Sequence, residues 1–122
     1  MVDGYTSSSI LYLYIKNLYP EARLDYIIHE GKQHGLADVV DEIIEKSGQI
    51  DLVICPDSSS NDEEQHLILE ECGVPVLVLD HHIQDTPTHS SAIIINNQTS
   101  SNYSNKQLTG AGVVYQFCRY LD

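Results

Sequence analysis

Basic residues are scarce in this sequence. Six lysines and arginines stand against 18 aspartates and glutamates, which gives a formal net charge of −12 over 122 residues. A stand-alone nucleic-acid-binding domain needs a basic patch that meets the phosphates, so this composition argues against one. Most of the acidic residues are expected to lie on a solvated surface. Some of them could instead converge to hold divalent cations, which would offset part of the charge.

Membrane and secretion signals are missing as well. No segment approaches the run of about 20 apolar residues that spans a bilayer, and the N-terminus lacks the basic and apolar regions of a secretory signal. The three cysteines, Cys55, Cys72 and Cys118, contain no C-x-x-C pair and are predicted to be reduced, mostly buried thiols. These absences predict a cytoplasmic protein of one domain with no membrane partner.

Apolar residues are present in short blocks that alternate between strand and helix periodicity. Such alternation implies crossover connections, and therefore an α/β fold with a doubly wound, mostly parallel sheet and helices on both faces. Strands are predicted over 24–30, 51–57, 74–80 and 91–97, and helices over 6–19, 36–48, 61–73 and 108–122.

Acidic and imidazole side chains follow the predicted strands where the strands end. Asp57 ends one strand, and Asp80, followed by His81 and His82, ends the next; Asp3 lies in a D-G turn just before the first predicted helix. Ligands of such sheets bind beyond the carboxyl ends of the strands, so we expect these groups to meet within a few ångströms. Carboxylates with one or two imidazoles suit manganese, magnesium or a similar cation. Two such cations about 3.5–4 Å apart can activate a water and clamp a phosphate ester.

Each of these residues has a simpler explanation when it is taken alone. An aspartate after a strand, such as Asp57, is often only a turn residue, and Asp62 at a helix start is best explained as a cap. Two adjacent histidines behind a buried strand are harder to explain by packing, because they must point in different directions. The joint placement therefore favours a functional site. The other histidines are expected at the surface or in loops: His29, His34, His66 and His89.

At these residues the chain resembles the DHH phosphoesterase superfamily, named for a triplet that reads here as Asp80-His81-His82. The stretch DGYTSSS resembles the first motif of the family, PDSSSND the second and LDHH the third, in the same order and spacing. The stretch LTGAGVVYQFC is similar to the helix that follows in RecJ-type, single-strand-specific exonucleases. The resemblance covers essentially the whole chain.

The resemblance implies a two-metal site that holds Mn²⁺ or Mg²⁺. Asp57 falls on the carboxylate that bridges the two cations. Asp3 and His81 fall on ligands of one of them.

The same resemblance implies roles beside the cations. His82 would face the scissile phosphate and stabilise or protonate it, while Asp80 would orient the histidines from behind, as carboxylates do for metal-bound imidazoles. Ser7 and Ser8, with the backbone amides around them, would meet a substrate phosphate at a helix N-terminus.

The chain also departs from the family pattern. Met1 stands where the first aspartate of D-x-D-G is expected, and the strand that leads into this motif is absent. A further metal-binding aspartate is expected beyond Asp122, and Ser58 and Ser59 replace the usual Asn-Gly pair. The second, substrate-gripping domain of the family is absent too. We therefore expect a single DHH domain over 1–122 that is incomplete at both ends.

The implied function is metal-dependent phosphodiester hydrolysis within a RecJ-like exonuclease that acts on single-stranded DNA. The isolated chain is expected to be weak or inactive, because one cation lacks most of its ligands. An alternative keeps the chemistry and changes the substrate to oligoribonucleotides, cyclic dinucleotides or pyrophosphate. Another is a non-catalytic scaffold or partner-binding module, which Met1 favours and the intact Asp57 and Asp80-His81-His82 oppose. The sequence leaves the oligomeric state open.

Overall fold

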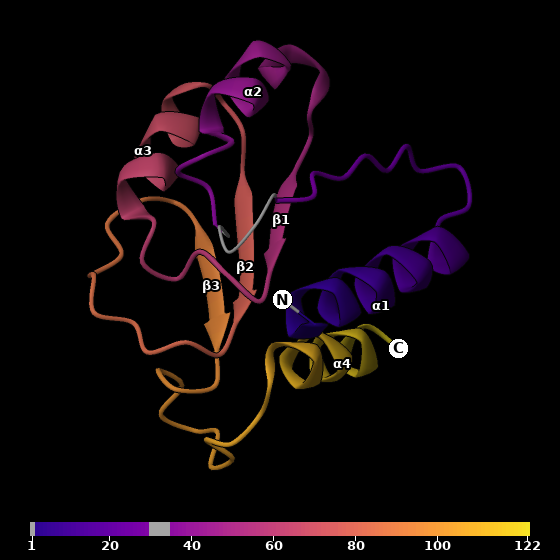
Figure 1. Cartoon of the computed structure of the whole chain (residues 1–122), viewed down its shortest axis with the longest axis vertical. Coiled ribbons are helices and arrows are strands. Elements are labelled where there is room, and N and C mark those ends of the chain that lie inside the picture. The colour runs from indigo at the N-terminus through magenta and orange to yellow at the C-terminus, as the bar shows by residue number, and fades with distance from the viewer. Residues whose placement is uncertain (1, 30–34) are drawn as a thin grey trace.

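A three-stranded parallel sheet lies between two pairs of helices in the computed structural model, which describes residues 2–29 and 35–122 (Figure 1). The strand order is β1-β2-β3, so β2 is the central strand. The predicted class, a parallel α/β fold with helices on both faces, is confirmed. The elements are α1 (Val2–Leu18), α2 (Val40–Glu45), the 3-10 turn η1 (Ser47–Gln49), β1 (Val53–Pro56), α3 (Glu63–Glu71), β2 (Val76–Asp80), β3 (Ile93–Asn96) and α4 (Gly110–Leu121).

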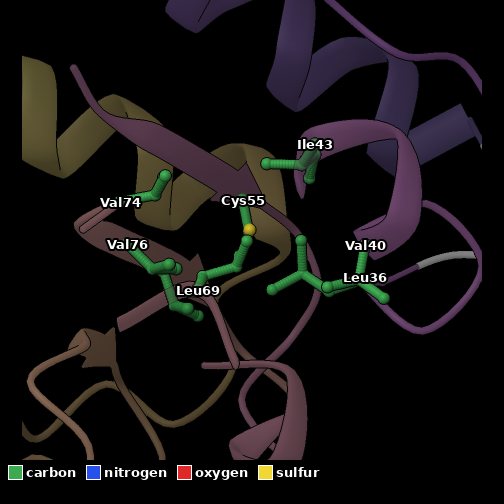
Figure 2. Close-up of a cluster of buried hydrophobic side chains, with 8 residues drawn as sticks. Leu36, Val40, Ile43, Cys55, Leu69, Val74 and Val76 are labelled. Atoms are coloured by element: carbon green, nitrogen blue, oxygen red, sulfur yellow. The ribbon is translucent and has the colours of Figure 1, made fainter. Parts of the chain in front are cut away.

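One face of the sheet packs against α2 and α3. Cys55, Val76 and Val78 point to this face, because alternate residues of a strand share a side of the sheet. Their burial removes apolar surface from water and supplies much of the stability of this layer. The buried cluster also contains Leu36, Val40, Ile43, Leu69 and Val74 (Figure 2).

The opposite face packs against α1 and α4, which lie side by side (Figure 1). Leu77 and Leu79 of the central strand point to this face, and Leu79 is fully buried. This second core cluster also contains Leu11, Val113, Val114 and Cys118. The packing brings the first turns of α1 and α4 to the carboxyl end of the sheet, where the predicted site lies (Figure 1).

The predicted strand over 24–30 is wrong for residues 24–29; Glu30 lies outside the described residues. This segment joins no strand of the sheet, and Tyr26 and Ile28 are exposed. A strand forms only where a neighbour pairs with its backbone groups. Its β-branched and aromatic residues favour a strand, but this propensity is not sufficient when no neighbouring strand pairs with the segment.

The first helix begins at Val2, earlier than predicted, and Met1 lies outside the described residues. The D-G pair is therefore not a turn, because Asp3 and Gly4 are part of the helix. The hydroxyls of Thr6 and Ser7 donate to the carbonyl oxygens of Val2 and Asp3, at 2.8 and 2.6 Å. This local bonding accommodates hydroxyl side chains inside a helix.

The remaining helices and strands are shorter than predicted and lie within their predicted ranges, except that η1 ends at Gln49, one residue beyond the predicted helix. The predicted helix over 36–48 is divided into a turn, α2 and η1. His66, expected at the surface, is instead buried at 1% exposure in α3, since it lies three residues before Leu69 on the face that packs on the sheet. No helix in the described parts of the chain is both long and apolar enough to cross a bilayer.

All three cysteines are free thiols, as predicted. Cys55 and Cys118 are buried, whereas Cys72 is exposed. Burial raises the pKa of Cys55 to about 12 and also raises the pKa of Cys118. Because the thiolate is the reactive form, these two buried groups are inert packing residues.

Candidate metal centre at the carboxyl edge of the sheet

The acidic and imidazole groups predicted from the sequence lie together at the carboxyl edge of the sheet. Asp57 follows β1, and its amide donates to Leu79 O of β2 at 2.7 Å, so Asp57 and the end of β2 are held side by side. One ligand atom each of Asp57, Asp80, His81 and His82 can be chosen so that all four lie within 4.8 Å of one another. The predicted convergence is therefore present.

Asp3 joins this cluster from α1. His81 Nε2 lies 2.9 Å from Asp57 Oδ1 and 3.5 Å from Asp3 Oδ2. Three elements, α1, β1 and β2, thus bring one carboxylate or imidazole each to a common point. Sequence reasoning predicted this meeting, and the metal-binding roles themselves stay predictions.

The backbone of Asp57 is left-handed, with φ of 59°, a conformation in which aspartate and asparagine are several-fold enriched. Its side chain lies against the first turns of α1 and α4. A Cβ at Gly110 would lie 2.5 Å from Asp57 Cγ and 2.6 Å from Asp57 Cβ, whereas one at Gly4 would lie 3.5 Å from Asp57 Oδ2. Position 110 therefore requires glycine because the carboxylate occupies the space of any side chain.

Asp3 caps a helix other than its own. Its Oδ2 accepts from Gly110 N at 2.8 Å and its Oδ1 from Ala111 N at 2.9 Å, while Thr109 Oγ1 accepts from Gly112 N at 3.0 Å. These contacts satisfy amides that the start of α4 leaves unpaired. Burial opposes ionisation of Asp3, but the amides of Ala111 and Gly110, with His81, hold its pKa below the usual value.

The surroundings of Asp57 are short of donors. Burial and the charge of Asp3 raise the pKa of Asp57, and the two histidines only partly oppose this. Its buried Oδ1 has no hydrogen-bond donor within the described residues, and the 2.9 Å approach of His81 Nε2 does not meet hydrogen-bond geometry.

These features of Asp57 fit a divalent cation. A buried carboxylate oxygen without a donor is costly unless a positive charge stabilises it. Neighbouring ligands of an octahedral cation with bonds of about 2.1 Å are about 3 Å apart, which matches the separation of Asp57 Oδ1 and His81 Nε2. Asp57, His81 and Asp3 thus form a donor set that could bind such a cation.

Asp80 has the opposite surroundings. It is 1% exposed. Its Oδ2 accepts from Ser60 Oγ at 2.7 Å and Ser60 N at 3.2 Å. Its Oδ1 accepts from His81 N at 2.8 Å and lies 2.6 Å from His82 Nδ1. Burial opposes ionisation, but the hydrogen bonds from Ser60, His82 and His81 hold the pKa of Asp80 below its usual value. With donors on both oxygens, Asp80 is better suited to orient a histidine than to bind a cation.

The predicted phosphate contacts at Ser7 and Ser8 are not favoured by the geometry. Ser7 is fully buried and donates to Asp3 O, whereas Ser8 is exposed. Because α1 begins at Val2, both serines lie beyond its first four residues, so their amides are bonded inside the helix. Their assignment to a phosphate stays a prediction.

Two residues that the sequence did not single out, Asn61 and Glu63, form hydrogen bonds with the backbone of the loop over 83–90. Asn61 Oδ1 accepts from Asp85 N at 2.7 Å and Thr86 N at 3.0 Å, and Asn61 Nδ2 donates to Ile83 O at 2.9 Å. The Glu63 carboxylate accepts from His89 N and Ser90 N. No sequence signal distinguishes these polar residues from other members of an acidic helix start.

Asp62 also differs from its prediction as a helix cap. It occupies the N-cap position of α3, but its side chain makes no capping bond there. Its Oδ2 instead accepts from Leu36 N at 2.9 Å, which ties the start of α3 to the segment before α2. A cavity of about 220 Å³ lies between these segments and His82, lined by Gly35, Ser59, Ser60, Asn61, Asp62 and Asp80.

The chain is similar to known proteins over nearly its whole length, which includes this edge of the sheet. Residues 2–122 match the family described as "DHH family, N-terminal domain". The chain is 47% identical over 121 residues to a Bacillus subtilis protein named as an SPbeta prophage-derived single-strand DNA-specific exonuclease, YorK. It is 30% identical over 117 residues to the single-stranded-DNA-specific exonuclease RecJ of Escherichia coli.

The two alignments cover 99% and 93% of this chain and 20% of each relative, so the chain spans about a fifth of the length of these relatives. The family match includes all the residues of the cluster, from Asp3 to the Asp80-His81-His82 triplet. The fold, the order of the motifs and these matches agree, and the chain belongs to the DHH family.

Proposed function

We propose that this chain is the DHH catalytic domain of a longer, RecJ-like enzyme that hydrolyses single-stranded DNA with Mn²⁺ or Mg²⁺. The observation that carries the proposal is the buried Oδ1 of Asp57, which lies beside His81 and Asp3 and has no donor among the residues that the structure describes. The two relatives named for single-strand DNA support the substrate, and their greater length supports a substrate-gripping part outside residues 1–122. The cytoplasmic location expected from the sequence belongs to the same proposal.

The carboxylates and His81 would hold the cations. Asp57 would bridge two of them, and Asp3 and His81 would bind one. When bound, the cations activate a water and neutralise charge on the phosphate. The amides of Gly110 and Ala111 keep the Asp3 carboxylate in one orientation, so the site needs little rearrangement.

His82 would act on the phosphate from beside the cations. Its side chain is 45% exposed, and its Nδ1 is held by Asp80 Oδ1. The other ring nitrogen, Nε2, would donate to a phosphate oxygen when the ring is protonated.

The test is cleavage of end-labelled single-stranded DNA by the full-length protein that carries this domain. Asp57→Asn removes the charge but suits the left-handed backbone, so the fold should survive. We expect the rate with Mn²⁺ to fall by about 100-fold or more, because each bound cation supplies several kcal/mol of charge stabilisation.

Asp85→Asn is the matched control, since Asp85 is exposed and contacts Asn61 only through its backbone. Wild-type cleavage by Asp57→Asn would contradict the role of Asp57. Cleavage of oligoribonucleotides or cyclic dinucleotides, with single-stranded DNA untouched, would replace the proposed substrate. A full-length protein that neither binds Mn²⁺ nor cleaves any of these would favour a scaffold.

A further inference from the structure

A buried hydrogen-bond network lies behind His82 and begins at the end of β3. Asn96 Nδ2 donates to Ser60 Oγ at 2.9 Å and to the backbone oxygen of His82 at 2.8 Å. Asn96 Oδ1 accepts from Gln98 N at 2.8 Å. Ser60 Oγ reaches Asp80 Oδ2 at 2.7 Å. Asn96 and Ser60 are each 3% exposed, so water does not replace these bonds.

The chemistry of the partners sets the direction of each bond. Gln98 N can only donate and the His82 carbonyl can only accept, which orients the Asn96 amide. Ser60 Oγ then accepts from Asn96 and must turn its own proton to Asp80. Asp80 is left as an acceptor throughout.

The His82 ring lies against the same carboxylate. Asp80 Oδ1 accepts from the backbone amides of His81 and His82, at 2.8 and 3.4 Å. An ionised oxygen cannot donate, so His82 Nδ1, 2.6 Å away, carries the proton of this contact. The network therefore selects the Nδ1-protonated tautomer of His82.

We propose that Ser60 and Asn96 are positioning residues: they hold the Asp80 carboxylate, and through it the His82 ring, with Nδ1–H toward Asp80 and with Nε2, the nitrogen that can donate only once the ring is protonated, toward the substrate. The tautomer part stands on the hydrogen bonds alone, and the substrate part rests on the function proposed above. Neither residue lies in the donor set that would bind a cation. Without the Ser60 hydroxyl, Asp80 Oδ2 would retain only the 3.2 Å amide contact, and Asn96 would lose an acceptor.

The first test is long-range ¹H–¹⁵N NMR of the His82 ring in the 122-residue chain at alkaline pH, where imidazoles are neutral. Wild type should show a protonated Nδ1 and an unprotonated Nε2. Ser60→Ala should shift the ring toward the Nε2-protonated tautomer, and Ser60→Thr, which keeps the hydroxyl, should restore the wild-type pattern. Ser58→Ala, in the same loop, should leave the pattern unchanged, because the Ser58 hydroxyl bonds to Pro56 O and Ser59 Oγ and makes no hydrogen bond to Asp80 within the described residues.

A wild-type ring pattern in Ser60→Ala, or a Ser60→Thr variant that fails to restore it, would overturn the proposal. If Ser60→Ala does not fold, Ser60→Cys preserves the side-chain size with a weaker donor and must show the same shift. This readout needs no cation and no cleavage, so it stands even if the proposed function fails.

The second test is kinetic and uses the full-length protein. Ser60→Ala should lower kcat by about 10- to 100-fold, the range found when outer partners of site histidines are removed. KM and Mn²⁺ affinity should stay within about twofold of wild type. A loss of Mn²⁺ affinity that matches the loss of kcat would show that Ser60 supports the cation site instead, and would overturn the positioning role.

Discussion

Asp57 and Asp80 are both aspartates, but their surroundings give the two carboxylates different properties. Both lie at the carboxyl ends of adjacent parallel strands, yet Asp57 Oδ1 has no donor in the described part of the chain while Asp80 has donors on both oxygens. The pKa of Asp57 is accordingly raised by burial, while hydrogen bonds hold that of Asp80 low despite its burial. The first carboxylate is suited to a cation and the second to an imidazole.

Gly110 is the residue whose size matters most for Asp57. In Gly110→Ala, the new methyl group would overlap the Asp57 side chain, which is fixed by a left-handed backbone. We expect a loss of about 1–3 kcal/mol in the free energy of unfolding, as for other overpacked sites, together with weaker Mn²⁺ binding. Urea denaturation and calorimetric titration would measure the two effects.

Gly112→Ala is the matched control in the same helix. A Cβ there meets the end of the Leu108 side chain at 3.0 Å, which can move aside. If Gly110→Ala bound Mn²⁺ as well as Gly112→Ala does, the close approach of Asp57 to α4 would be unimportant for the site.

At the scale of elements, α3 contacts both the sheet and the loop that follows His82. Its first residue, Glu63, binds the backbone of that loop, and His66 one turn later is buried toward the core. Neither ring nitrogen of His66 has a hydrogen-bond partner within the described residues, and Glu63 Oε1 is 3.9 Å from His66 Nδ1. Burial lowers the pKa of His66, although Asp62, Glu63 and the Ser59 backbone oppose this shift.

This histidine predicts acid sensitivity of the fold. Because the pKa is lower in the folded state, the unfolded chain binds the proton more tightly, and stability falls as pH drops through about 6.5. His66→Leu should remove this part of the pH dependence and change stability at pH 8 by no more than about 1 kcal/mol, since it replaces unpaired polar atoms. Urea denaturation between pH 5.5 and 8 measures both.

His89→Gln is the control for this experiment, since the His89 side chain is exposed and its backbone amide contacts Glu63. It should retain the wild-type pH dependence. A His66→Leu protein that lost stability at acidic pH as steeply as wild type would rule out His66 as the cause.

At the scale of the whole molecule, the net charge of −12 and the carboxylate cluster act together. Self-repulsion of surface acids destabilises a compact state, and salt screens it. A cation bound at the sheet edge would add a second, saturable stabilisation, because a ligand that binds only the folded state shifts the unfolding equilibrium.

These two contributions can be separated by thermal unfolding. With Mn²⁺ at 100 times its dissociation constant we expect about 2.7 kcal/mol of stabilisation, or about 10 °C in Tm for a domain of 122 residues. NaCl at the same ionic strength should give a smaller, non-saturating rise. In Asp57→Asn the saturable rise in Tm should disappear, and the rise caused by NaCl should remain. If Mn²⁺ and NaCl raised the Tm of the wild type equally, the stabilisation would come from charge screening alone.

The sequence by itself determined the layout of the site. Apolar runs that end in Asp57 and Asp80 predict parallel strands, and parallel strands place their carboxyl ends at one edge, so the meeting of these groups follows from the chain order. The prediction failed where pairing decides the outcome: residues 24–29 have the composition of a strand but pair with no strand of the sheet.

Only the tertiary structure decided what surrounds each site residue. The contacts of Asp3 with the start of α4 and of Ser60 with Asp80 join residues between 20 and 108 positions apart. Asp57 Oδ1, in turn, has no donor among the described residues. Hydrogen bonds need their atoms within a few tenths of an ångström of the right distance. Periodicity places a residue on a face or at an edge, whereas packing of α1, α4 and the loops brings its atoms to that precision.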